Sequence, residues 1–343
     1  MRGLLKKTIE QAIQHQDLSL LLVSLLLLGG AIYQPSVPVK HDIYSYFFVL
    51  DITQSMNTQD LQLAGKPTSR LDFSKQILRE TMSTLPCGTK ASIGLFTGVH
   101  VVALYLPIEV CANFSSIQET IDHVEWRSAW TADSRIRESL LATAQVITNF
   151  PEPAQVVYFS DGEEAPKLHT FNTRDLSTFQ SGTDWLLVGM GSKAGGPIPM
   201  LDKSNQRIGY WSHESMQLAP GAAPIAAAGI LKRKSDLAEN PHDRYISKLA
   251  EAYLQSTAKE MNAHYVHGTD FHTIYDAMKR QKPVRREWAP YPVSWLLATL
   301  AGLMILGAHI PWEWLKKHKE NKGKPQSLTE QQHITVADLN NQT

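Results

Sequence analysis

The sequence predicts an α/β protein with a doubly wound, mostly parallel, Rossmann-like sheet, one antiparallel edge strand and a transmembrane helix toward each end of the chain. Short apolar strands alternate with amphipathic helices between residues 44 and 285, a pattern typical of a parallel sheet covered on both faces. Two apolar runs that meet near Gly98 indicate a hairpin, which supplies the antiparallel edge. Two long apolar segments lie outside this alternation.

The composition of the chain indicates how large a core it can bury and argues against one class of partner, nucleic acid. The chain has 343 residues, 43% of them hydrophobic, so it can bury one large core or two modest ones. Lysine plus arginine equals aspartate plus glutamate, 33 each, so the formal net charge is zero. The central region has no long basic stripe interleaved with aromatic residues, which argues against nucleic acid as the partner.

The first apolar segment covers residues 18–33 and is nearly unbroken. As a helix it would rise about 24 Å, slightly short of a hydrocarbon core of roughly 30 Å. A cleaved signal peptide therefore stays open as an alternative, since residues 29–31 are small. The preceding stretch is long and amphipathic, which favours an uncleaved anchor. We expect a cytoplasmic N-terminus over residues 1–17 and a transmembrane helix over residues 18–34.

The second apolar segment is clearer. Residues 293–310 are apolar, and aromatic residues flank them on both sides, as at the two interfaces of a bilayer. We expect a transmembrane helix over residues 291–312 and a polar, disordered, cytoplasmic tail over residues 313–343. The aromatic residues are Tyr291, Trp295, Trp312 and Trp314, and the basic residues that follow are Lys316, Lys317, Lys319, Lys322 and Lys324.

Flanking charge predicts the orientation. Arg2, Lys6 and Lys7 precede the first segment, and only Lys40 follows it before the central domain. The positive-inside rule therefore places both termini in the cytoplasm and residues 35–290 outside. Basic residues on both sides of the second segment leave that segment ambiguous by itself, but the downstream lysines lie closer to it.

Both cysteines fall in the part expected outside, where an oxidising compartment permits a disulfide. Cys87 lies 11 residues before Gly98 and Cys111 lies 13 residues after it. Positions nearly equidistant from a hairpin tip become neighbours across the two strands, so the spacing favours a Cys87–Cys111 disulfide. Two free buried thiols are the alternative.

The central elements follow one another with short connections. Residues 35–43 contain two prolines and are expected as a stiff linker, and residues 44–285 are expected to form the domain. Residues 190–240 are rich in Gly, Pro, Ala and Ser and are expected as an insertion of long loops. The expected strands are residues 44–50, 91–97, 101–106, 155–159, 184–188 and 264–267, and the expected helices are residues 70–85, 134–150, 245–261 and 271–280.

Oxygen-bearing side chains follow two of these strands. Asp51, Thr53 and Ser55 come directly after the first strand, and alternate positions of an extended segment point the same way. Asp161 follows the strand at residues 155–159, and Thr131 lies in a loop before a helix. Ligands of parallel sheets sit beyond the carboxyl ends of the strands. Because hard divalent cations prefer oxygen ligands, the pattern predicts a metal site there.

The pattern D-x-T-x-S after a first strand, a loop threonine and S-D-G after a later strand resembles the metal ion-dependent adhesion site (MIDAS) of von Willebrand factor A (VWA) domains. Thr53 stands where the family usually has serine, and Trp130-Thr131 stands where it has Gly-Thr. The resemblance implies one divalent ion, Mg²⁺ first and Ca²⁺ or Mn²⁺ as alternatives. The implied ligands are the charge-balancing Asp51 and Asp161 and the neutral hydroxyls of Thr53, Ser55 and Thr131.

The same resemblance implies a function. Few anionic groups would bind the ion directly, so it would accept a Glu or Asp from a partner protein. S-R-L-D at residues 69–72 and the segment 189–199 look like bacterial Bat-type membrane VWA proteins, and the accessory proteins of methanol dehydrogenase (the MxaC and MxaL types) have a comparable architecture. We expect a bacterial inner-membrane protein with a periplasmic domain that helps an enzyme such as methanol dehydrogenase to mature, for example by calcium insertion. A Bat-like scaffold for envelope stress tolerance is the alternative.

An enzyme is a weaker hypothesis. Asp51 after a first strand could act as a phosphotransfer nucleophile, but that chemistry needs a second acid two residues later, where this chain has Thr53. No catalytic Ser-His-Asp or Cys-His constellation is apparent, so no enzymatic activity is expected. The two acidic residues beside the site, Glu163 and Glu164, are expected as solvated loop charges. A scaffold that acts through its terminal helices alone is a third reading, and strand-end or helix-capping roles for Asp51 and Asp161 are the structural alternative.

Overall fold

The computed structural model describes residues 16–129, 133–169, 173–179, 184–218 and 237–309. The chain divides into two compact units. One unit is His41–Glu287, and the other combines Met1–Lys40 with Trp288–Thr343. Three predictions concern segments outside the described residues in whole or in large part, namely Thr131, the cytoplasmic N-terminus and the C-terminal tail.

A mostly parallel sheet forms the centre of His41–Glu287, with the strand order β14-β9-β8-β2-β5-β6. The edge strand β6 runs antiparallel to β5, and the short strand β7 also pairs with β5 in antiparallel fashion. This architecture confirms the predicted α/β class and the antiparallel edge. The strands are β2 Ser45–Asp51, β5 Lys90–Phe96, β6 Val101–Ala103, β7 Ile108–Glu109, β8 Gln155–Ser160, β9 Trp185–Gly189 and β14 His264–His267.

Strand β2 lies in the middle of the sheet, between β5 and β8. The next strands of the chain, β5 and β6, lie on one side of β2, and the later strands β8, β9 and β14 lie on the other. The order in which strands are added to the sheet therefore reverses at β2. Leu50 is paired with Leu95 of β5 and with Phe159 of β8. The carboxyl ends of these strands therefore meet at one edge, which is the usual place for a ligand site in such sheets.

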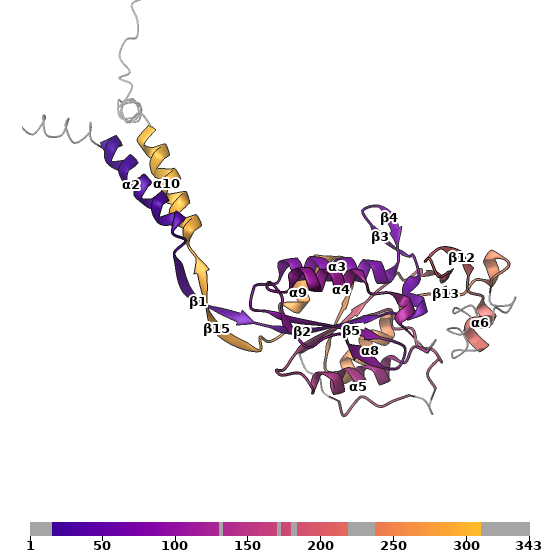
Figure 1. Ribbon diagram of the computed structural model, residues 1–343. Coiled ribbons are helices and arrows are strands. Elements are labelled where there is room, and N and C mark those ends of the chain that lie inside the picture. Colours follow the sequence, from indigo (N-terminus) through magenta and orange to yellow (C-terminus); the bar gives the residue numbers. More distant parts are fainter. Residues whose placement is uncertain (1–15, 130–132, 170–172, 180–183, 219–236, 310–343) are drawn as a thin grey trace, which may run out of the picture. The chain divides into compact units, whose positions relative to one another are not determined.

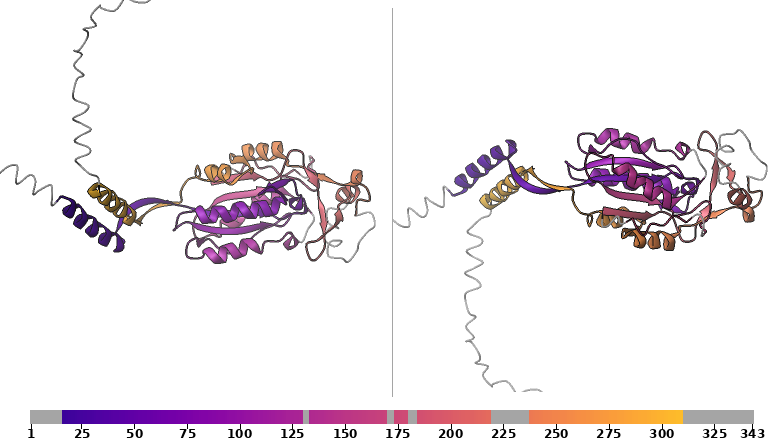
Figure 2. Two further views of the ribbon diagram at one scale, coloured as in Figure 1. Left: turned by 90° about the horizontal axis from the view of Figure 1, so that it is seen from above. Right: turned by 90° about the horizontal axis from the view of Figure 1, so that it is seen from below.

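Helices cover both faces of the sheet (Figure 1), and in the view from above in Figure 2, α3 lies in the middle of one helical layer. Alternate residues of β2 serve the two cores, because successive side chains of a strand point to opposite faces. Phe48 and Leu50 belong to the core that contains Leu78 of α3, and Phe47 and Val49 belong to the other core. The first layer has α3 Arg70–Thr84, α4 Phe114–Asp122 and α9 Phe271–Met278, and the second has α5 Ile136–Ile147 and α8 Glu251–Met261.

Helix α3, which carries residues of the site, begins at a well-defined cap. Ser69 has an extended backbone, and its hydroxyl accepts a hydrogen bond from the Asp72 amide at 3.0 Å. The Ser69 hydroxyl also donates to the Asp72 carboxylate at 2.7 Å. Such a cap stabilises a helix by about 1 kcal/mol, and here it sets the first residue of the helix at Arg70.

Three expectations about local structure were wrong. The expected linker forms strand β1 (Ser36–Ile43), which pairs with β15 (Arg285–Pro292). A proline is tolerated there because the strand has one partner and a free edge. The helix expected from residue 245 begins only at Glu251, because Ile246–Ser247 forms strand β13. Helix α4 was not expected.

The insertion after β9 contains short elements rather than loops alone. Two of its strands form a hairpin, and a third pairs with β13. Residues 219–236 lie outside the described part. The elements are β10 Gly196–Pro197, β11 Pro199–Leu201, β12 Arg207–Tyr210, helix α6 His213–Leu218 and the 3-10 helix η5 Pro241–Asp243, and a small hairpin before α3 has strands β3 Leu61–Leu63 and β4 Lys66–Thr68.

The two terminal apolar segments form helices α2 (Gln16–Ile32) and α10 (Ser294–His309), which pack against each other within their own unit. These helices have 17 and 16 residues. Within the described part of the chain, no helix combines the length and the apolar character needed to cross a bilayer. The predicted transmembrane spans over residues 18–34 and 291–312 are thus not found among the described residues.

Candidate metal site

Three of the predicted ligands lie together at the end of β2. Asp51 is the last residue of the strand, and the 3-10 helix η1 (Gln54–Asn57) follows it. One oxygen of Asp51 accepts hydrogen bonds from the Thr53 amide at 2.9 Å and from the Thr53 hydroxyl at 2.6 Å. The hydroxyls of Thr53 and Ser55 lie 3.3 Å apart. The D-x-T-x-S spacing therefore brings three oxygen-bearing side chains to one point.

The second acidic element reaches the same point from β8. The Ser160 hydroxyl donates to the other oxygen of Asp51 at 2.6 Å and accepts from the Gly162 amide at 3.0 Å. Asp161 follows directly and is completely buried. Gly162 has a φ of 73°, and a Cβ there would lie 2.6 Å from Leu254, so the turn behind Asp161 requires glycine.

Two buried carboxylates in one site create an excess of negative charge. Burial and, after it, the charge of Asp161 raise the pKa of Asp51 to about 7, against the hydrogen bonds from Ser160 and Thr53, which lower it. Among the described residues Asp51 forms no ion pair, whereas Asp161 pairs with Arg70, and a divalent cation is one way to supply positive charge to Asp51. The donors are all oxygens, which suits Mg²⁺, Ca²⁺ or Mn²⁺ rather than a nitrogen- or sulfur-seeking ion.

Arg70 holds Asp161 in place, a role that the sequence did not reveal. Its guanidinium is fully buried and donates to the Asp161 carboxylate at 2.7 Å. It binds both oxygens of Asp60, at 2.9 and 2.8 Å, and the hydroxyl and carbonyl of Ser247, at 2.8 and 3.1 Å. Burial acts to raise the pKa of Asp60, but the hydrogen bonds and charge of Arg70 outweigh it and hold that pKa below its usual value.

The loop after β9 closes around Arg70. A Cβ at Gly191 would lie 2.5 Å from the Arg70 Nε, and this glycine has a φ of 120°. The Ser192 amide and hydroxyl both donate to Asp60, at 2.8 and 3.0 Å. The motif at residues 69–72 and the glycines at residues 189–199 were noticed only as family features. These two segments contact each other only in the folded protein, so their spacing along the chain did not predict the contact.

The expectation that Glu163 and Glu164 are solvated loop charges was wrong. Glu163 accepts hydrogen bonds from the hydroxyls of Tyr245 and Ser247, and Glu164 accepts one from the Tyr253 hydroxyl at 2.5 Å. Burial, followed by the charge of Asp161, raises the pKa of Glu163. Burial raises the pKa of Glu164 to about 7. Strand β13 and helix α8 cover this loop, and their sequences come some 80 residues later, at Ile246–Ser247 and Glu251–Met261.

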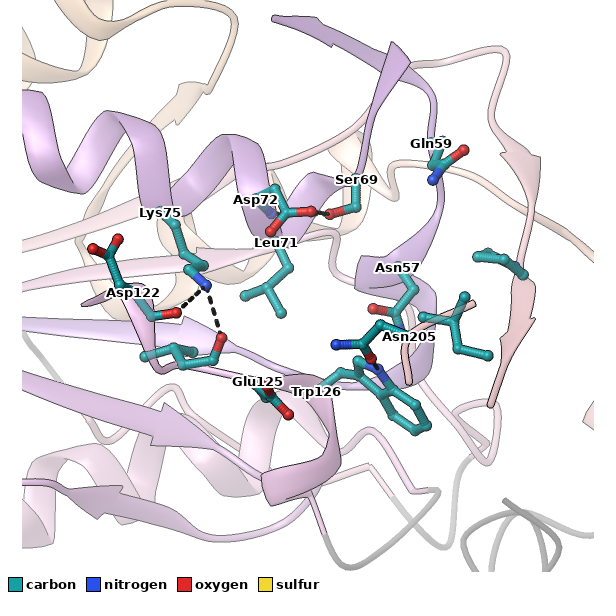
Figure 3. Close-up of a pocket in the computed structure, with 13 residues that line it drawn as sticks. Asn57, Gln59, Ser69, Leu71, Asp72, Lys75, Asp122, Glu125, Trp126 and Asn205 are labelled. Atoms are coloured by element: carbon teal, nitrogen blue, oxygen red, sulfur yellow. Dashed lines mark hydrogen bonds between the residues drawn. The ribbon is translucent and has the colours of Figure 1, made fainter. Parts of the chain in front are cut away.

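The structure thus brings three of the five predicted ligands together, Asp51, Thr53 and Ser55, and places Asp161 near enough for its charge to act on Asp51. The Asp161 oxygens bind Arg70 and the Glu163 amide. Thr131 lies outside the described residues, which end at residue 129 and resume at residue 133. A cavity of about 310 Å³ lies beside this site, and Asn57, two residues after Ser55, is part of its wall. Figure 3 shows this cavity, whose floor includes side chains of α3.

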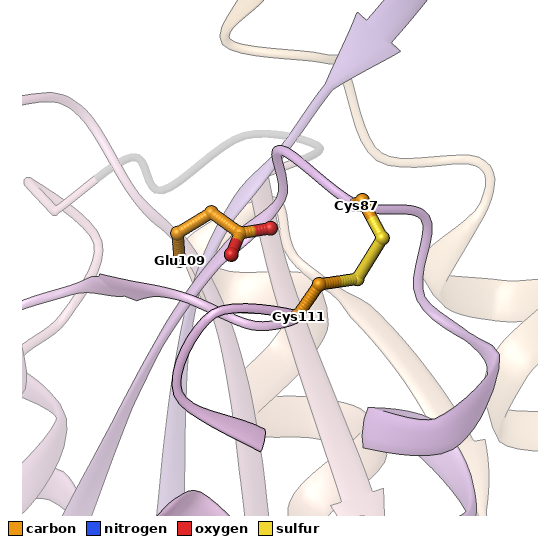
Figure 4. A group of neighbouring side chains, drawn as sticks. All are labelled: Cys87, Glu109 and Cys111. Carbon is orange, nitrogen blue, oxygen red and sulfur yellow. A yellow bond between two sulfur atoms is a disulfide. The ribbon is translucent and has the colours of Figure 1, made fainter. Parts of the chain in front are cut away.

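A disulfide joins Cys87 and Cys111, with their Cα atoms 5.3 Å apart (Figure 4). It links the turn before β5 to the segment after β7, as the hairpin spacing favours. Glu109 lies beside it and accepts hydrogen bonds from the Gly88 and Ala112 amides, at 2.7 and 2.5 Å. The described residues contain no free cysteine. The disulfide therefore lies at the amino end of β5, whereas Asp51 lies beside Phe96 at the carboxyl end of that strand.

Comparisons with known proteins place the chain among distant relatives. No protein-family model matches it. A UPF0353 protein of Mycobacterium tuberculosis is 22% identical over 235 residues, covering 62% of this chain and 67% of that protein. The solved structure of BatB from Bacteroides thetaiotaomicron is 16% identical with a TM-score of 0.48, covering 69% of this chain and 98% of that chain. An aerotolerance-related membrane protein from Bacteroides fragilis is 18% identical with a TM-score of 0.46 and the same coverage.

Proposed function

We propose that this chain is a VWA-type binding module that holds one divalent metal ion and uses it to bind an acidic residue of a partner protein. One observation carries the proposal. The hydroxyls of Thr53 and Ser55 and two buried carboxylates converge at the ends of β2 and β8, with Asp51 in a site of excess negative charge. A structural role alone would not favour two carboxylates buried so close together.

In this proposal the hydroxyls of Thr53 and Ser55, together with Thr131, are neutral ligands, and Asp51 and Asp161 balance the charge. Mg²⁺ is the first candidate, with Ca²⁺ and Mn²⁺ as alternatives. The ion would supply an electrophilic position for an incoming carboxylate. The bond from Arg70 fixes one oxygen of Asp161. That bond also lowers the negative charge that reaches the ion, which favours an outside anion as the last ligand.

We further propose that the site binds and does not catalyse. Thr53 occupies the position where an aspartate-based phosphatase needs its second acid, and its hydroxyl is engaged with Asp51. Metal-dependent hydrolysis of p-nitrophenyl phosphate by the purified full chain, abolished in Asp51→Ala, would contradict this part of the proposal.

Of the two cellular roles, we propose the Bat-like scaffold of the bacterial envelope. The sequence features at residues 69–72 and 189–199 are similar to Bat-type proteins, and both form the Arg70 network behind the site. The names of the solved relatives, BatB and an aerotolerance-related membrane protein, agree with that role. Maturation of methanol dehydrogenase, the leading expectation from the sequence, has no support in these comparisons.

We propose attachment to the bacterial inner membrane through the apolar helices α2 and α10, with the domain in the periplasm. The support is the charge asymmetry around the first segment and the Cys87–Cys111 disulfide, which suits an oxidising compartment. The test is protease treatment of spheroplasts. Degradation of the domain in intact spheroplasts supports the proposal, and protection until the membrane is permeabilised refutes it.

The metal proposal is tested by titration calorimetry of the purified full chain with Mg²⁺, Mn²⁺ and Ca²⁺. We expect uptake of one ion per chain, abolished in Asp51→Ala and unchanged in Asp276→Ala, a control that removes an exposed carboxylate paired with Lys279. Absence of uptake of all three ions would refute the proposal. Partner recovery that is the same with wild type and Asp51→Ala would favour a scaffold that works through the helices alone.

A further inference from the structure

The cavity of about 310 Å³ beside the metal site has a chemistry of its own. Its size lies at the small end of the range for ligand sites in proteins, roughly 300–1,000 Å³. None of the four described predicted ligands, Asp51, Thr53, Ser55 and Asp161, lines it. The residues that line it come from η1, α3, the end of α4 and the hairpin of the insertion, and they are Asn57, Gln59, Ser69, Leu71, Asp72, Lys75, Asp122, Val124, Glu125, Trp126, Pro199, Leu201 and Asn205.

Lys75 brings a buried positive charge to the cavity. Only 8% of the residue is exposed, and its ammonium donates to the carbonyls of Asp122 and Val124, at 2.9 Å each. An ammonium has three donors, so these carbonyls use two of them. Lys75 forms no ion pair within 4.0 Å in the described part of the chain. Burial lowers the pKa of this amine, against the charges of Asp72, Asp122 and Glu125, which raise it.

Asn57 brings a second unused donor. Its amide nitrogen is buried and has no hydrogen-bond acceptor among the described residues, and only 5% of the residue is exposed. In Figure 3, Leu71 lies between Lys75 and Asn57, and Asp122 lies beyond Lys75. A buried donor without a partner destabilises the folded protein, because it has lost its hydrogen bonds to water. A ligand that offers an acceptor here would replace one of those hydrogen bonds.

Most of the wall is polar and a smaller part is apolar, and two of its three acidic side chains are paired with arginines. Leu71, Val124 and Trp126 are buried and would contact a short aliphatic stem. Asp122 pairs with Arg79, and Glu125 pairs with Arg127 at 3.5 Å.

Asp72 is the rim carboxylate without a cation partner among the described residues. It lies in the first turn of α3, and its carboxylate accepts a hydrogen bond from the Ser69 hydroxyl. The helix N-terminus and the Ser69 hydroxyl offset part of this negative charge, and the charge of Lys75 must outweigh the rest for an anion to enter.

We propose that this cavity binds the carboxylate of an acidic residue in a polypeptide, with Lys75 supplying the charge, Asn57 a hydrogen bond and Leu71, Val124 and Trp126 the contact for the aliphatic stem. A glutamate side chain fits this order of groups, because two methylene groups precede its carboxylate. Gln59 and Asn205 also line the cavity and are exposed, so their amides suit the backbone of a peptide, although the Asn205 oxygen already accepts hydrogen bonds from Trp126 and Arg127. The site is independent of the metal, so it would be a second point of recognition on the same edge of the domain.

The test is calorimetric titration of the full chain, after dialysis to remove metal, with three probes. EDTA is avoided because it carries carboxylates itself. The probes are acetyl-Ala-Glu-Ala-amide, acetyl-Ala-Gln-Ala-amide and free L-glutamate. We expect saturable binding of the glutamate peptide and at least fivefold weaker binding of the glutamine peptide. Binding of free glutamate without binding of the peptide would overturn a polypeptide as the source, and no saturable binding of the glutamate peptide would overturn the site.

Variants identify the residues. Lys75→Met keeps the buried stem and removes the charge, and Asn57→Asp is nearly isosteric and replaces a donor with an acid. We expect each substitution to weaken the binding of the glutamate peptide at least tenfold. The control Lys66→Met removes an exposed charge from β4 and should leave binding unchanged. Lys75→Met leaves two carbonyls without a donor, which can impair folding, so thermal unfolding of each variant is measured in parallel. If Lys75→Met does not fold, peptide binding by Asn57→Asp is the test of the site. Equal peptide binding by wild type and a folded variant would overturn the proposal.

Metal titration separates this proposal from the metal-dependent function. Lys75→Met should take up Mg²⁺ with wild-type affinity, since Lys75 is not a predicted ligand, and Asp51→Ala should still bind the glutamate peptide. Loss of peptide binding in Asp51→Ala, with the fold intact, would show that the peptide goes to the metal site and would overturn the second site.

Discussion

Arg70 is the buried cation that binds Asp161 in the candidate metal site, and its removal is the sharpest test of the structure. Arg70→Met keeps an unbranched apolar side chain of similar reach and deletes five hydrogen bonds, two to Asp60, one to Asp161 and two to Ser247. It leaves two carboxylates without their cation in a buried place. Breaking a buried ion pair by removing one partner costs about 3–5 kcal/mol. Since whole domains are stable by only about 5–15 kcal/mol, the loss is large.

The assay is urea unfolding of the full chain with and without MgCl₂. In the metal-free protein we expect the free energy of unfolding to fall by about 3–5 kcal/mol in Arg70→Met. A bound ion stabilises by about 2.7 kcal/mol at one hundred times its dissociation constant. Mg²⁺ should therefore stabilise the variant at least as much as the wild type, because the cation partly replaces the lost positive charge beside Asp161.

The matched control is Arg79→Met, which breaks the exposed ion pair with Asp122. Exposed pairs contribute about 0–1 kcal/mol, so this variant should unfold nearly as the wild type does. A double variant, Arg70→Met with Asp60→Asn, should recover part of the loss because it also removes one unpaired charge. A loss in Arg70→Met no larger than that in Arg79→Met would refute the view that Arg70 organises the site.

Three further perturbations have defined outcomes. Since burial raises the pKa of Glu164 to about 7, the folded protein binds that proton more tightly than the unfolded chain, and the stability that this gives is lost as pH rises from about 4.5 through 7. In pH-dependent urea unfolding, Glu164→Gln should thus be more stable than wild type at pH 8, by about 1–2 kcal/mol, and equal at pH 4; an equal difference at both values would contradict this. Reduction of the disulfide, or Cys87→Ser with Cys111→Ser, should cost about 3 kcal/mol for a sequence separation of 24 residues, and an unchanged melting temperature would contradict that. Gly162→Ala should lower both stability, by about 1–3 kcal/mol, and metal uptake, because it strains a φ of 73° and drives a methyl group into Leu254, whereas wild-type values for both would refute the need for glycine.

The main elements of the fold could be predicted because their signals are local. The buried strands β2, β8 and β9 are continuous apolar runs, as expected for strands covered on both faces. The hairpin around Gly98 was also readable from two runs and a turn. Strand β1 was not, because its burial pattern is mostly exposed and its prolines suggest a linker. Only pairing with β15, about 250 residues later, makes it a strand.

The candidate site divides in the same way. The sequence alone determined that Asp51, Thr53 and Ser55 share one direction, because alternation over five residues at a strand end is a property of local backbone geometry. It also determined the class of sheet, through the order of apolar strands and helices. The tertiary structure alone decided that Arg70 binds Asp161 across 91 residues, that Glu163 and Glu164 are covered by β13 and α8, and that Lys75 and Asn57 face one cavity. Burial, unused donors and charge balance depend on which distant segments pack together, and spacing along the chain carries no record of that.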